Sequence, residues 1–473
     1  MSSFQYDFGM IGLGVMGSNL LLNMADSGFA VAGYDIDKNK CAALDASASP
    51  KKIVKGFFDL NEMIASLRLP RKVMMLVPAG KPVDDVLSRI VPLLAAGDIV
   101  IDGGNSHYVD TLRRVNAMQE LGIHFMGIGI SGGEEGARSG PSIMPGGDLK
   151  AYEAVKPVLE AVAAKVNGKP CVAYLGMGAA GHYVKMVHNG IEYGIMQLIS
   201  ETYWLLKKGA QLPNDQLHET FKKWNEGSME SFLLEITANI FTQIDDLAGG
   251  LLLDVISDMA GSKGTGKWTS QDAMDIAVPI PNIDIAVAIR NLSAYKNERA
   301  DAALLYQSGS FKAINSENFI EQSRDALHFA TIICYAQGLA LLHKASEELH
   351  MEIPVSEVIR VWRGGCIIRA AFLDDLAEAF QKNSNLSNIL LDASIAEKVR
   401  SLEKSIRSLV AEAALSGLPV PGHMAALSYF DAYRSEHLPT NLIQAQRDYF
   451  GAHTYQRTDM TGSFHTEWKQ TKP

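Results

Sequence analysis

A short glycine-rich segment near the N-terminus most constrains how this chain can fold. The apolar stretch Phe8–Ile11 runs into Gly12-Leu13-Gly14-Val15-Met16-Gly17, a helical pattern follows, and a second apolar stretch at residues 30–34 ends at Asp35. This order is typical of dinucleotide-binding folds, in which the glycines let a pyrophosphate meet backbone amides at a helix N-terminus. The sequence therefore predicts a nucleotide-binding α/β domain; the alternative is a tight turn without a ligand.

The end of the second predicted strand indicates which dinucleotide binds. Asp35 lies 18 residues after Gly17 (35 − 17), where an acidic side chain hydrogen-bonds the ribose hydroxyls of NAD. The extra phosphate of NADP would be repelled there by on the order of 4 kcal/mol per pair of unit charges at ~4 Å. Ile36 and Asp37 follow, and the nearest cation is Lys38, with no arginine. NAD is the predicted cofactor and NADP a weaker one, unless Asp35 is simply a solvated strand end.

Three loops rich in small residues follow further predicted strands. We expect strands at residues 72–77, 98–102, 124–130 and 171–175, with helical patterns between them. In a doubly wound sheet, ligands bind beyond the carboxyl ends of the strands, so these loops are candidates to line the site, although ordinary turns have the same composition. The loops are Pro78-Ala79-Gly80, Gly103-Gly104-Asn105-Ser106 and Ser131-Gly132-Gly133.

The periodicity of apolar residues changes after residue 178, where helical patterns replace alternating strands and helices. We therefore predict an α/β plus all-α fold. A Rossmann-type doubly wound sheet would occupy residues 1–178, an all-helical substrate and dimerisation domain residues 179–436, and a C-terminal tail residues 437–473. Trp224 and Trp362, which stand 138 residues apart (362 − 224) in similar surroundings, predict an internal duplication of the helical domain.

One helical segment, residues 181–194, carries a polar stripe on an otherwise apolar helix. Four polar side chains fall at i, i+3, i+4 and i+7 with a tyrosine beside them: Lys185, His188, Asn189, Glu192 and Tyr193. A solvated surface would give the same stripe. However, the three glycines of the segment cost roughly 1 kcal/mol each inside a helix, which indicates close approach of a ligand or another backbone. We interpret the stripe as a site in which Lys185 and Glu192 are a candidate base and acid.

Basic residues in three other segments are candidates to meet an anionic substrate. The loop at residues 261–268 is rich in glycine but lacks the Walker spacing, so Lys263 or Lys267 either binds a phosphate or belongs to a flexible basic loop. Arg290 lies on an apolar helical pattern and needs an anionic partner if it is buried. The polar tail contains Arg447 and His453, and its aromatic residues predict that it packs on a partner such as a second subunit.

Composition excludes several other classes of function. A net charge of −10 and a pI of 5.7 argue against non-specific attraction to nucleic acid or anionic membranes. The four cysteines show no CxxC spacing and no nearby metal-ligand partners, so we expect reduced thiols and no metal site. Residues 1–7 lack a basic segment followed by an apolar run, and no later segment has the ~20 apolar residues that span a bilayer. We expect a cytoplasmic protein.

Taken together, these features closely resemble those of the decarboxylating 6-phosphogluconate dehydrogenases, within the β-hydroxyacid dehydrogenase superfamily, over essentially the whole chain. The motifs are IGLGVMG, IDGGNS, GISGGEEGARSGPSIMPGG, GHYVKMVHNGIEYG, GSKGTGKW, VWRGGCIIRA and LIQAQRDYFGAHTY. The resemblance implies a homodimer in which the tail of one subunit reaches the other. It also implies oxidation of 6-phospho-D-gluconate at carbon 3, loss of carbon dioxide, and tautomerisation to D-ribulose 5-phosphate.

The resemblance further implies a role for each candidate residue. Lys185 would be the base that takes the hydroxyl proton, and Glu192 the acid that protonates carbon 1 of the enediol. The sugar acid would be held by Asn105, Ser131, Gly132, Gly133, His188 and Asn189. The phosphate and nearby hydroxyls would be held by Tyr193, Lys263, Arg290 and, from the partner subunit, Arg447 and His453. The cofactor would lie on Gly12, Leu13, Gly14, Val15, Met16, Gly17, Asp35, Ile36, Asp37, Val77, Pro78, Ala79 and Asn105.

Physical chemistry is consistent with these implied roles. A lysine base must be neutral near pH 7, which requires burial or neighbouring cations. Once reprotonated, the same lysine can stabilise the developing enolate, so we expect a reaction that needs no metal ion.

Two positions depart from the family pattern. Many members follow the second strand with Asn-Arg-Thr, whose arginine grips the NADP phosphate, whereas this chain has Asp35-Ile36-Asp37. Where the family often has Val-Lys-Ala-Gly, this chain has Val77-Pro78-Ala79-Gly80. Both departures remove a cation and favour NAD. Two alternatives stay open, a β-hydroxyacid dehydrogenase for a non-phosphorylated acid and a non-catalytic NAD-binding sensor.

Overall fold

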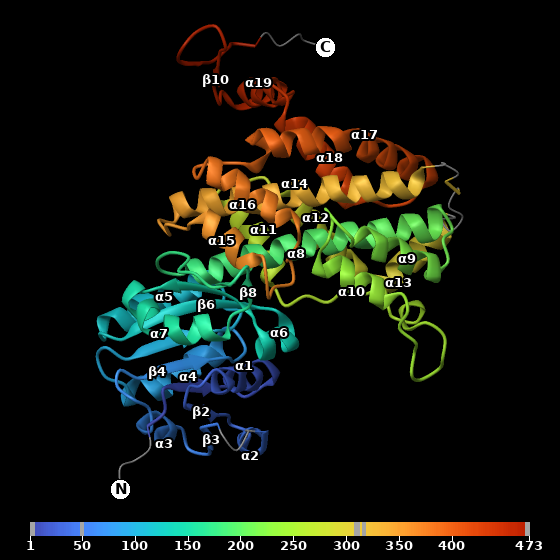
Figure 1. Ribbon diagram of the computed structural model, residues 1–473. Coiled ribbons are helices and arrows are strands. Elements are labelled where there is room, and N and C mark those ends of the chain that lie inside the picture. The colour runs from blue at the N-terminus through green and yellow to red at the C-terminus, as the bar shows by residue number, and fades with distance from the viewer. Residues whose placement is uncertain (1–4, 48–51, 307–312, 315–317, 469–473) are drawn as a thin grey trace. The chain divides into compact units, whose positions relative to one another are not determined.

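The computed structural model of the chain describes residues 5–47, 52–306, 313–314 and 318–468. The chain forms two compact units, Met1–Ala426 and Leu427–Pro473 (Figure 1). Residues 1–4, part of the segment considered for targeting, and residues 469–473, the end of the predicted tail, lie outside the described residues.

A seven-stranded sheet forms the N-terminal part of the larger unit, and its doubly wound, mostly parallel arrangement confirms the predicted fold class. The strand order is β3-β2-β1-β4-β5-β6-β7, with β7 antiparallel to β6 and the other neighbours parallel. The order reverses between β1 and β4, which is where sheets of this kind bind nucleotides. The strands are β1 Phe8–Ile11, β2 Val31–Tyr34, β3 Val54–Phe57, β4 Lys72–Met75, β5 Ile99–Asp102, β6 His124–Ser131 and β7 Ser142–Gly147.

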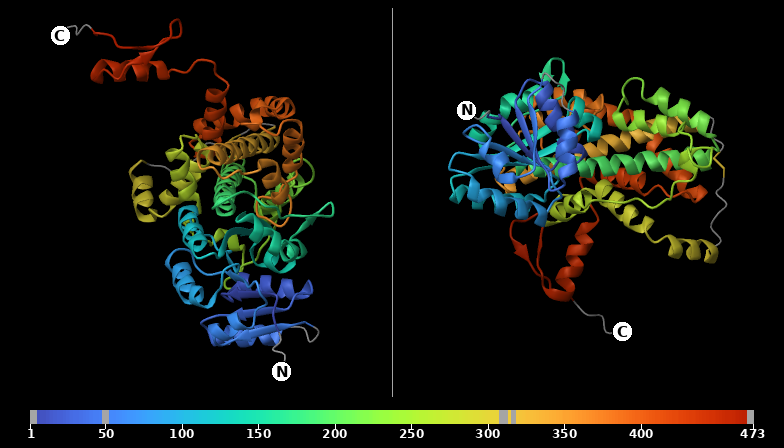
Figure 2. Two further views of the ribbon diagram at one scale, coloured as in Figure 1. Left: turned by 90° about the vertical axis from the view of Figure 1, so that its left-hand side faces the viewer. Right: turned by 90° about the horizontal axis from the view of Figure 1, so that it is seen from below.

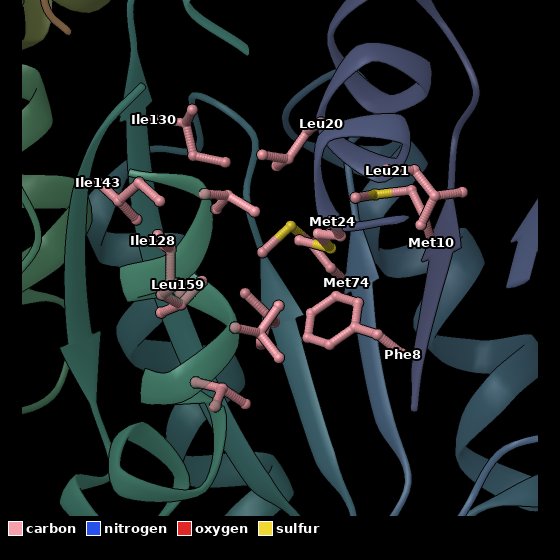
Figure 3. Packing of buried hydrophobic residues seen from close by; sticks show 14 of the residues in the cluster. Phe8, Met10, Leu20, Leu21, Met24, Met74, Ile128, Ile130, Ile143 and Leu159 are labelled. Atoms are coloured by element: carbon pink, nitrogen blue, oxygen red, sulfur yellow. The ribbon is translucent and has the colours of Figure 1, made fainter. Parts of the chain in front are cut away.

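Helices cover both faces of this sheet, so most of its strands are buried apolar runs without alternation. On one face, Phe8 and Met10 of β1 pack with Leu21 and Met24 of α1 and with Leu159 of α7 (Figure 3). A second cluster on the other face joins the strands to α3, α4 and α5. The helices are α1 Val15–Asp26, α2 Lys38–Ser47, α3 Leu60–Ala65, α4 Lys81–Ile90, α5 Tyr108–Glu120, α6 Gly133–Ser139 and α7 Leu149–Val162.

Three strand expectations were incomplete or wrong. The sequence pattern missed β3 and β7, and the strand expected at residues 171–175 is absent. Those residues do run beside β7, where the amide of Ile143 donates to the carbonyl oxygen of Cys171 at 3.0 Å. However, the only ladder contact that forms is an isolated bridge between Ile143 and Val172. Pro145 has no amide hydrogen to donate to this segment, although its carbonyl oxygen accepts from the amide of Leu175 at 2.8 Å, so the hydrogen-bond pattern of a strand stays incomplete.

The rest of the larger unit is helical, and α8 is its central element. The sheet strands β6 and β7 pack on α8, and α14 lies alongside it (Figures 1 and 2). The helices are α8 Ala180–Trp204, α9 Asn214–Trp224, α10 Phe232–Ile240, α11 Thr265–Asp275, α12 Pro281–Ser293, α13 Lys296–Leu305, α14 Phe319–Glu348, α15 Val355–Trp362, α16 Phe372–Lys382, α17 Ala393–Ser416 and α18 Pro421–Tyr433. Short elements are β8 Lys165–Val166, β9 Lys169–Pro170, η1 Val91–Leu93, η2 Leu205–Gly209, η3 Leu252–Asp254 and η4 Ile389–Leu391.

The two tryptophans that suggested a duplication lie at similar places in the order of helices. Trp224 is the last residue of α9 and Trp362 the last residue of α15, and each of these helices follows a long helix, α8 or α14. The segments after the tryptophans also pair with each other. The Phe232 amide donates to the Arg369 carbonyl oxygen at 3.1 Å, and the amide of Ala371 donates back to the 230 carbonyl oxygen at 2.8 Å. The segments that follow the two tryptophans therefore pair with each other through their backbones.

Helix α14 is the one element, among the described residues, that is long and apolar enough to cross a membrane by length and composition, which the sequence reading had not anticipated. Its most apolar window is 78% buried inside the protein. Because it packs against α8 and α17, it reads as a core helix of the larger unit. All four cysteines are buried and free, as expected.

The smaller unit contains the end of α18, the helix α19 Thr440–Gly451 and a hairpin of β10 Tyr455–Gln456 and β11 Ser463–Phe464. Asp448 of α19 has no exposed surface and holds the hairpin to the helix. Its carboxylate accepts hydrogen bonds from the amides of Thr454 (2.9 Å) and Thr466 (3.1 Å) and from Nε1 of Trp468 (2.9 Å).

Candidate active site

The predicted helix at residues 181–194 is part of α8, and its glycines allow close packing. A Cβ at Gly181 would lie 2.2 Å from the carbonyl oxygen of Gly127 in β6, and one at Gly194 would lie 2.4 Å from Sγ of Cys334 in α14. A Cβ at Gly190 would lie 2.8 Å from a threonine of α11. The three glycines therefore admit neighbouring protein segments, which accounts for them without a ligand.

A cleft of about 660 Å³ opens along the polar face of α8. Its walls come from the glycine turn after β1, the loops after β5 and β6, α8 itself, the loop before α11, and α12. The lining residues are Met16, Asn105, Ile130, Ser131, Gly132, Gly133, Lys185, Asn189, Glu192, Tyr193, Met196, Gly261, Ser262, Lys263, Thr265, Arg290 and Ile367. Segments far apart in the sequence thus bring most of the predicted substrate residues to one cleft.

Lys185 and Glu192 have opposite pKa shifts inside this cleft. Burial lowers the pKa of the Lys185 amine below its ordinary value, although Glu192 and Cys366 act in the other direction. Burial raises the pKa of the Glu192 carboxyl, although Lys185 and Arg290 oppose the shift. Both shifts favour the uncharged forms, a free amine and a protonated carboxyl. These are the states that a general base and a general acid need.

His188 lies behind the cleft wall and positions two lining residues. Its Nε2 is 3.2 Å from Oγ of Ser131, and its Nδ1 is 3.0 Å from Oδ1 of Asn189. Burial, followed by the charge of Lys185, lowers the pKa of His188 well below its ordinary value, so the ring is neutral. Because Asn189 Oδ1 can only accept, Nδ1 carries the hydrogen and Nε2 accepts from Ser131. Nδ2 of Asn189 donates in turn to Oγ1 of Thr265 at 3.3 Å.

A cationic corner of the cleft is built around Arg290. Its guanidinium lies 3.5 Å from the centre of the Tyr193 ring and donates to the Gly261 carbonyl oxygen at 3.1 Å. Lys263, two residues further along that loop, is exposed. Arg290 is only half-buried, and no carboxylate forms an ion pair with Arg290 or Lys263 within the described part of the chain. The corner can therefore receive an anionic group.

The N-terminus of α1 fits a dinucleotide pyrophosphate. Gly14 is the N-cap, no side chain caps the helix, and no acidic residue lies in its first turn. A Cβ at Gly14 would meet nothing within 4 Å, whereas one at Gly12 would lie 2.4 Å from the Leu76 carbonyl oxygen, and one at Gly17 would lie 1.9 Å from that of Gly12. Gly12 and Gly17 thus allow tight packing of the turn, and Gly14 leaves open space beside the backbone amides of the helix N-terminus. Val15, next to Gly14, is 56% exposed.

Asp35 is held at the end of β2 by backbone amides. The cation beside it is not the one that the sequence suggested. Its carboxylate accepts hydrogen bonds from the amides of Leu13 (2.8 Å) and Asp37 (2.9 Å). Burial acts to raise the pKa of Asp35, but these bonds and a nearby cation lower it overall. That cation is Lys40, with Nζ 3.4 Å from the carboxylate, and not Lys38, which is nearer in sequence. Lys40 lies one residue before Cys41 on the first turn of α2, which brings it back toward the strand end.

The remaining cofactor candidates lie at the ends of β2 and β4. Ile36 is 82% exposed, and Pro78 and Ala79 are also exposed, so their side chains are open to a ligand. Val77 is half-buried and packs against the core of the sheet.

The loop that carries Asn105 is fixed from beneath by Asp102, the last residue of β5. The Asp102 carboxylate accepts from Oγ of Ser106 at 2.6 Å and from the amide of Gly104 at 3.0 Å. Asn105 itself is exposed to the cleft. The loop therefore presents Asn105 between the N-terminus of α1 and α8.

Arg447 and His453, the two tail candidates, belong to the smaller unit. Both are exposed there, and Arg447 donates to Oε1 of Gln444 at 3.1 Å. Within the described ranges, no group of three or more histidine, cysteine, aspartate or glutamate side chains is arranged to hold a metal ion.

Several lining residues were not predicted from the sequence. Met196 lies one turn beyond Glu192 on α8 and could have been included by extending the helical face. Thr265 and Ser262 belong to the basic loop, where only lysines had been considered. Ile367 comes from the VWRGGCIIRA motif of the second helical copy, so only the folded chain places it in the cleft.

Comparison with known proteins supports both parts of this description. Residues 7–176 match the family model described as the NAD binding domain of 6-phosphogluconate dehydrogenase, and residues 181–468 match the one described as the 6-phosphogluconate dehydrogenase C-terminal domain. The chain is 51% identical to the NADP(+)-dependent, decarboxylating 6-phosphogluconate dehydrogenase of Bacillus subtilis, over 97% of this chain and 98% of the relative.

Two further similarities cover nearly the whole chain. A decarboxylating 6-phosphogluconate dehydrogenase of Synechococcus elongatus is 49% identical over 98% of this chain and 99% of its own length. A solved 6-phosphogluconate dehydrogenase of Plasmodium falciparum, studied in apo form, with its cofactor NADP+ and with its substrate 6-phosphogluconate, matches with a TM-score of 0.95 and 44% identity. That match covers 98% of this chain and 100% of the solved one.

Proposed function

The chain belongs to the family of decarboxylating 6-phosphogluconate dehydrogenases, and on that premise we propose the following reaction and roles. The enzyme oxidises 6-phospho-D-gluconate at carbon 3, releases carbon dioxide and forms D-ribulose 5-phosphate. The observation that carries the proposal is the pair of opposite pKa shifts at Lys185 and Glu192, which face the same cleft.

Lys185 acts first, as the general base. Its buried amine is neutral enough to take the proton of the carbon-3 hydroxyl. The nicotinamide, when bound, supplies the acceptor for the hydride that leaves carbon 3. Ser131 and Asn189, held by the neutral ring of His188, orient the sugar acid against the amine.

Lys185 and Glu192 then share the later steps. The β-keto acid loses carbon dioxide when the bond to the carboxylate breaks and its electron pair moves into an enolate. Lys185 now carries the proton and donates it to the developing oxyanion, so the protein supplies the positive charge that the step needs. Glu192, held protonated by burial, gives its proton to carbon 1 of the enediol while the neutral Lys185 takes the proton of the enediol hydroxyl, which leaves the ketone. The proposal therefore requires no metal ion, and turnover should survive a chelator such as EDTA.

The cationic corner favours 6-phosphogluconate over a non-phosphorylated β-hydroxyacid as the substrate. Arg290 and Lys263 would bind the phosphate of 6-phosphogluconate, with Tyr193 beside them. A non-phosphorylated β-hydroxyacid would leave these cations without a partner. The direct test is to compare initial rates with 6-phosphogluconate and with gluconate. Turnover of gluconate alone would favour the rival, and NAD binding without turnover of any sugar acid would favour a sensor.

We also propose that NAD is preferred over NADP. Asp35 presents a buried carboxylate to the ribose, and Ile36 stands exposed where an arginine would grip the extra phosphate. Lys40 offsets part of the negative charge, but its side chain is 45% exposed and is already paired with Asp35. The B. subtilis relative is named NADP(+)-dependent, so this preference rests on the residues at the strand end and needs its own test.

Replacing Asp35 with Asn and Ile36 with Arg should shift the ratio of kcat/KM for NADP and NAD toward NADP by at least about tenfold, because it removes a like charge worth on the order of 4 kcal/mol before screening. A matched variant, Lys40→Met, should instead weaken NADP. The measurement is the pair of kcat/KM values for each enzyme. An unchanged ratio in the Asp35→Asn, Ile36→Arg enzyme would contradict this account of cofactor choice.

The proposal includes a homodimer in which Arg447 and His453 of the partner subunit complete each site. Both side chains are exposed on the smaller unit, and Arg447 forms no ion pair within the described part of the chain. That unit also exposes large apolar side chains, including Phe450 at 73% and Leu442 at 62%. Such a surface is consistent with packing on another subunit.

Mixing two inactive chains tests this arrangement. Lys185→Met and Arg447→Ala chains should each form weakly active homodimers, whereas refolding or co-expressing them together should restore about one quarter of wild-type activity. Half of randomly paired dimers are mixed, and each has one intact site built from the unmodified halves. If Arg447 instead served its own subunit, no mixed dimer would contain an intact site and activity would stay low.

A further inference from the structure

One buried carboxylate outside the cleft joins α8 and α11, which both line the cleft, to α5, which follows the cleft-lining loop of Asn105. Asp272 of α11 is 5% exposed, and its two oxygens accept hydrogen bonds from different tyrosines, Tyr108 of α5 at Oδ1 and Tyr183 of α8 at Oδ2. The two tyrosine rings also meet edge to face, with centres 5.0 Å apart. No lysine or arginine pairs with Asp272 among the residues that the structure describes. The phenols are therefore what offsets the cost of burying this charge.

Helix α11 connects Asp272 to the loop of Lys263, which lines the part of the cleft proposed to bind the substrate. It begins at Thr265, directly after the loop that places Lys263 in the cleft. Two hydrogen bonds fix α11 to α8. The side-chain amide of Asn189 donates to Oγ1 of Thr265, and Oγ1 of Thr269 donates to the carbonyl oxygen of Met186 at 3.0 Å. Asp272 lies seven residues after Thr265 (272 − 265), on the same side of the helix. The bond at Asp272 therefore fixes the rotation of the helix that presents the Lys263 loop.

Helix α5 connects Asp272 to the loop of Asn105, on the other side of the cleft. Tyr108 is its first residue, and Asn105, which lines the cleft, precedes it in the loop held by Asp102. A second contact joins the same two helices, because the ring of His107 lies 4.8 Å from that of Trp268 in α11. The loops that present Asn105 and Lys263 to the cleft are thus connected through Tyr108 and Asp272.

We propose that Asp272 is a positioning residue that sets the distance between the Asn105 loop and the Lys263 loop across the cleft. A substrate held at one end by the cationic corner then meets the reacting groups at a fixed separation. The inference rests on the proposed function for the identity of the substrate. It assigns to Tyr108 and Asp272 a role in alignment, exerted without contact with the substrate.

The test is a double-mutant cycle of Tyr108→Phe and Asp272→Ala. Tyr108→Phe removes only the hydroxyl that joins α5 to the carboxylate. It should lower kcat/KM for 6-phosphogluconate by between about tenfold and 10²-fold, as expected for a small misplacement of reacting groups. The dissociation constant of the cofactor should change much less than kcat/KM does, because the glycine turn and Asp35 are untouched and only the Asn105 loop is displaced. In an Asp272→Ala background, Tyr108→Phe should have no further effect on kcat/KM.

Controls separate alignment from folding. Asp275→Asn changes an exposed carboxylate on the same helix and should leave kcat/KM and Tm unchanged. Asp272→Asn keeps the shape and should retain partial activity if Asp272→Ala fails to fold. The inference is overturned if Tyr108→Phe lowers Tm while kcat/KM stays at the wild-type value, or if its effect is the same with and without Asp272. Wild-type turnover tests the proposed function separately, since the coupling can be measured with any acid that the enzyme oxidises.

Discussion

The long helices α8 and α14 both run through the core of the helical part, yet only α8 contains a buried lysine. Ser323, Ala326 and Ala330 of α14 stand 138 residues after Lys185, His188 and Glu192 of α8 (323 − 185, 326 − 188, 330 − 192). All three α14 residues are fully buried and carry no charge. These three positions of α14 are thus filled by residues that pack, whereas the corresponding positions of α8 hold residues for which we propose a chemical or positioning role.

The difference shows which parts of α8 the fold requires and which it tolerates. A buried lysine and a buried carboxyl cost free energy, and α14 shows that a long core helix of this kind forms without them. Burial in α8 is also what moves the pKa values of Lys185 and Glu192 in opposite directions. The proposed roles of Lys185 and Glu192 would account for the stripe, whereas packing accounts for the apolar remainder of α8.

The largest effect on kcat is expected when Lys185, the proposed general base, is replaced. Lys185→Met keeps the length and apolar stem of the side chain but removes the proton acceptor, so kcat should fall by about 10³-fold or more. Ser323→Ala is the matched change in α14, and kcat should stay within about twofold of wild type. Steady-state rates with 6-phosphogluconate measure both. If kcat fell by a similar factor in both variants, the difference that we infer between α8 and α14 would be wrong.

A smaller and opposite effect is expected in stability. Lys185→Met should raise the free energy of unfolding by about 1 to 3 kcal/mol, because it replaces a buried amine with an apolar group of similar volume. Ser323→Ala should change it by less than about 0.5 kcal/mol, since the serine bonds only the Phe319 carbonyl oxygen of its own helix, at 2.7 Å. Urea unfolding of both variants measures this. A destabilised Lys185→Met enzyme would mean that the amine contributes to folding.

Much of the fold was predictable because its signals are local. The glycine turn, the apolar strands and the switch to helical periodicity all lie in short windows of sequence. β7 was missed because Ser142–Gly147 contains a proline and two glycines, and only its pairing with β6 makes it a strand. The opposite error at residues 171–175 has a related cause, since an apolar stretch becomes a strand only where a neighbour offers the amides to pair with.

The site was predictable where its residues share one helix face. Lys185, His188 and Glu192 could be grouped by period alone, whereas Thr265 and Ile367 reach the cleft from separate segments. Lys40 was overlooked because distance along the chain favoured Lys38, while the first turn of α2 brings Lys40 to Asp35. No sequence signal connected Asp272 with Tyr108, because helix packing alone unites them.

The most direct test of the account is the pH dependence of kcat for wild type and Glu192→Gln. In the wild type, kcat should rise as Lys185 loses its proton at a lowered pKa and fall as Glu192 loses its proton at a raised one. Glu192→Gln should lose the falling limb, because an amide does not titrate. Its rising limb should stay close to the wild-type position, because Glu192 is protonated and uncharged over that range. A falling limb that persists unchanged in Glu192→Gln would contradict the assignment of the acid to α8.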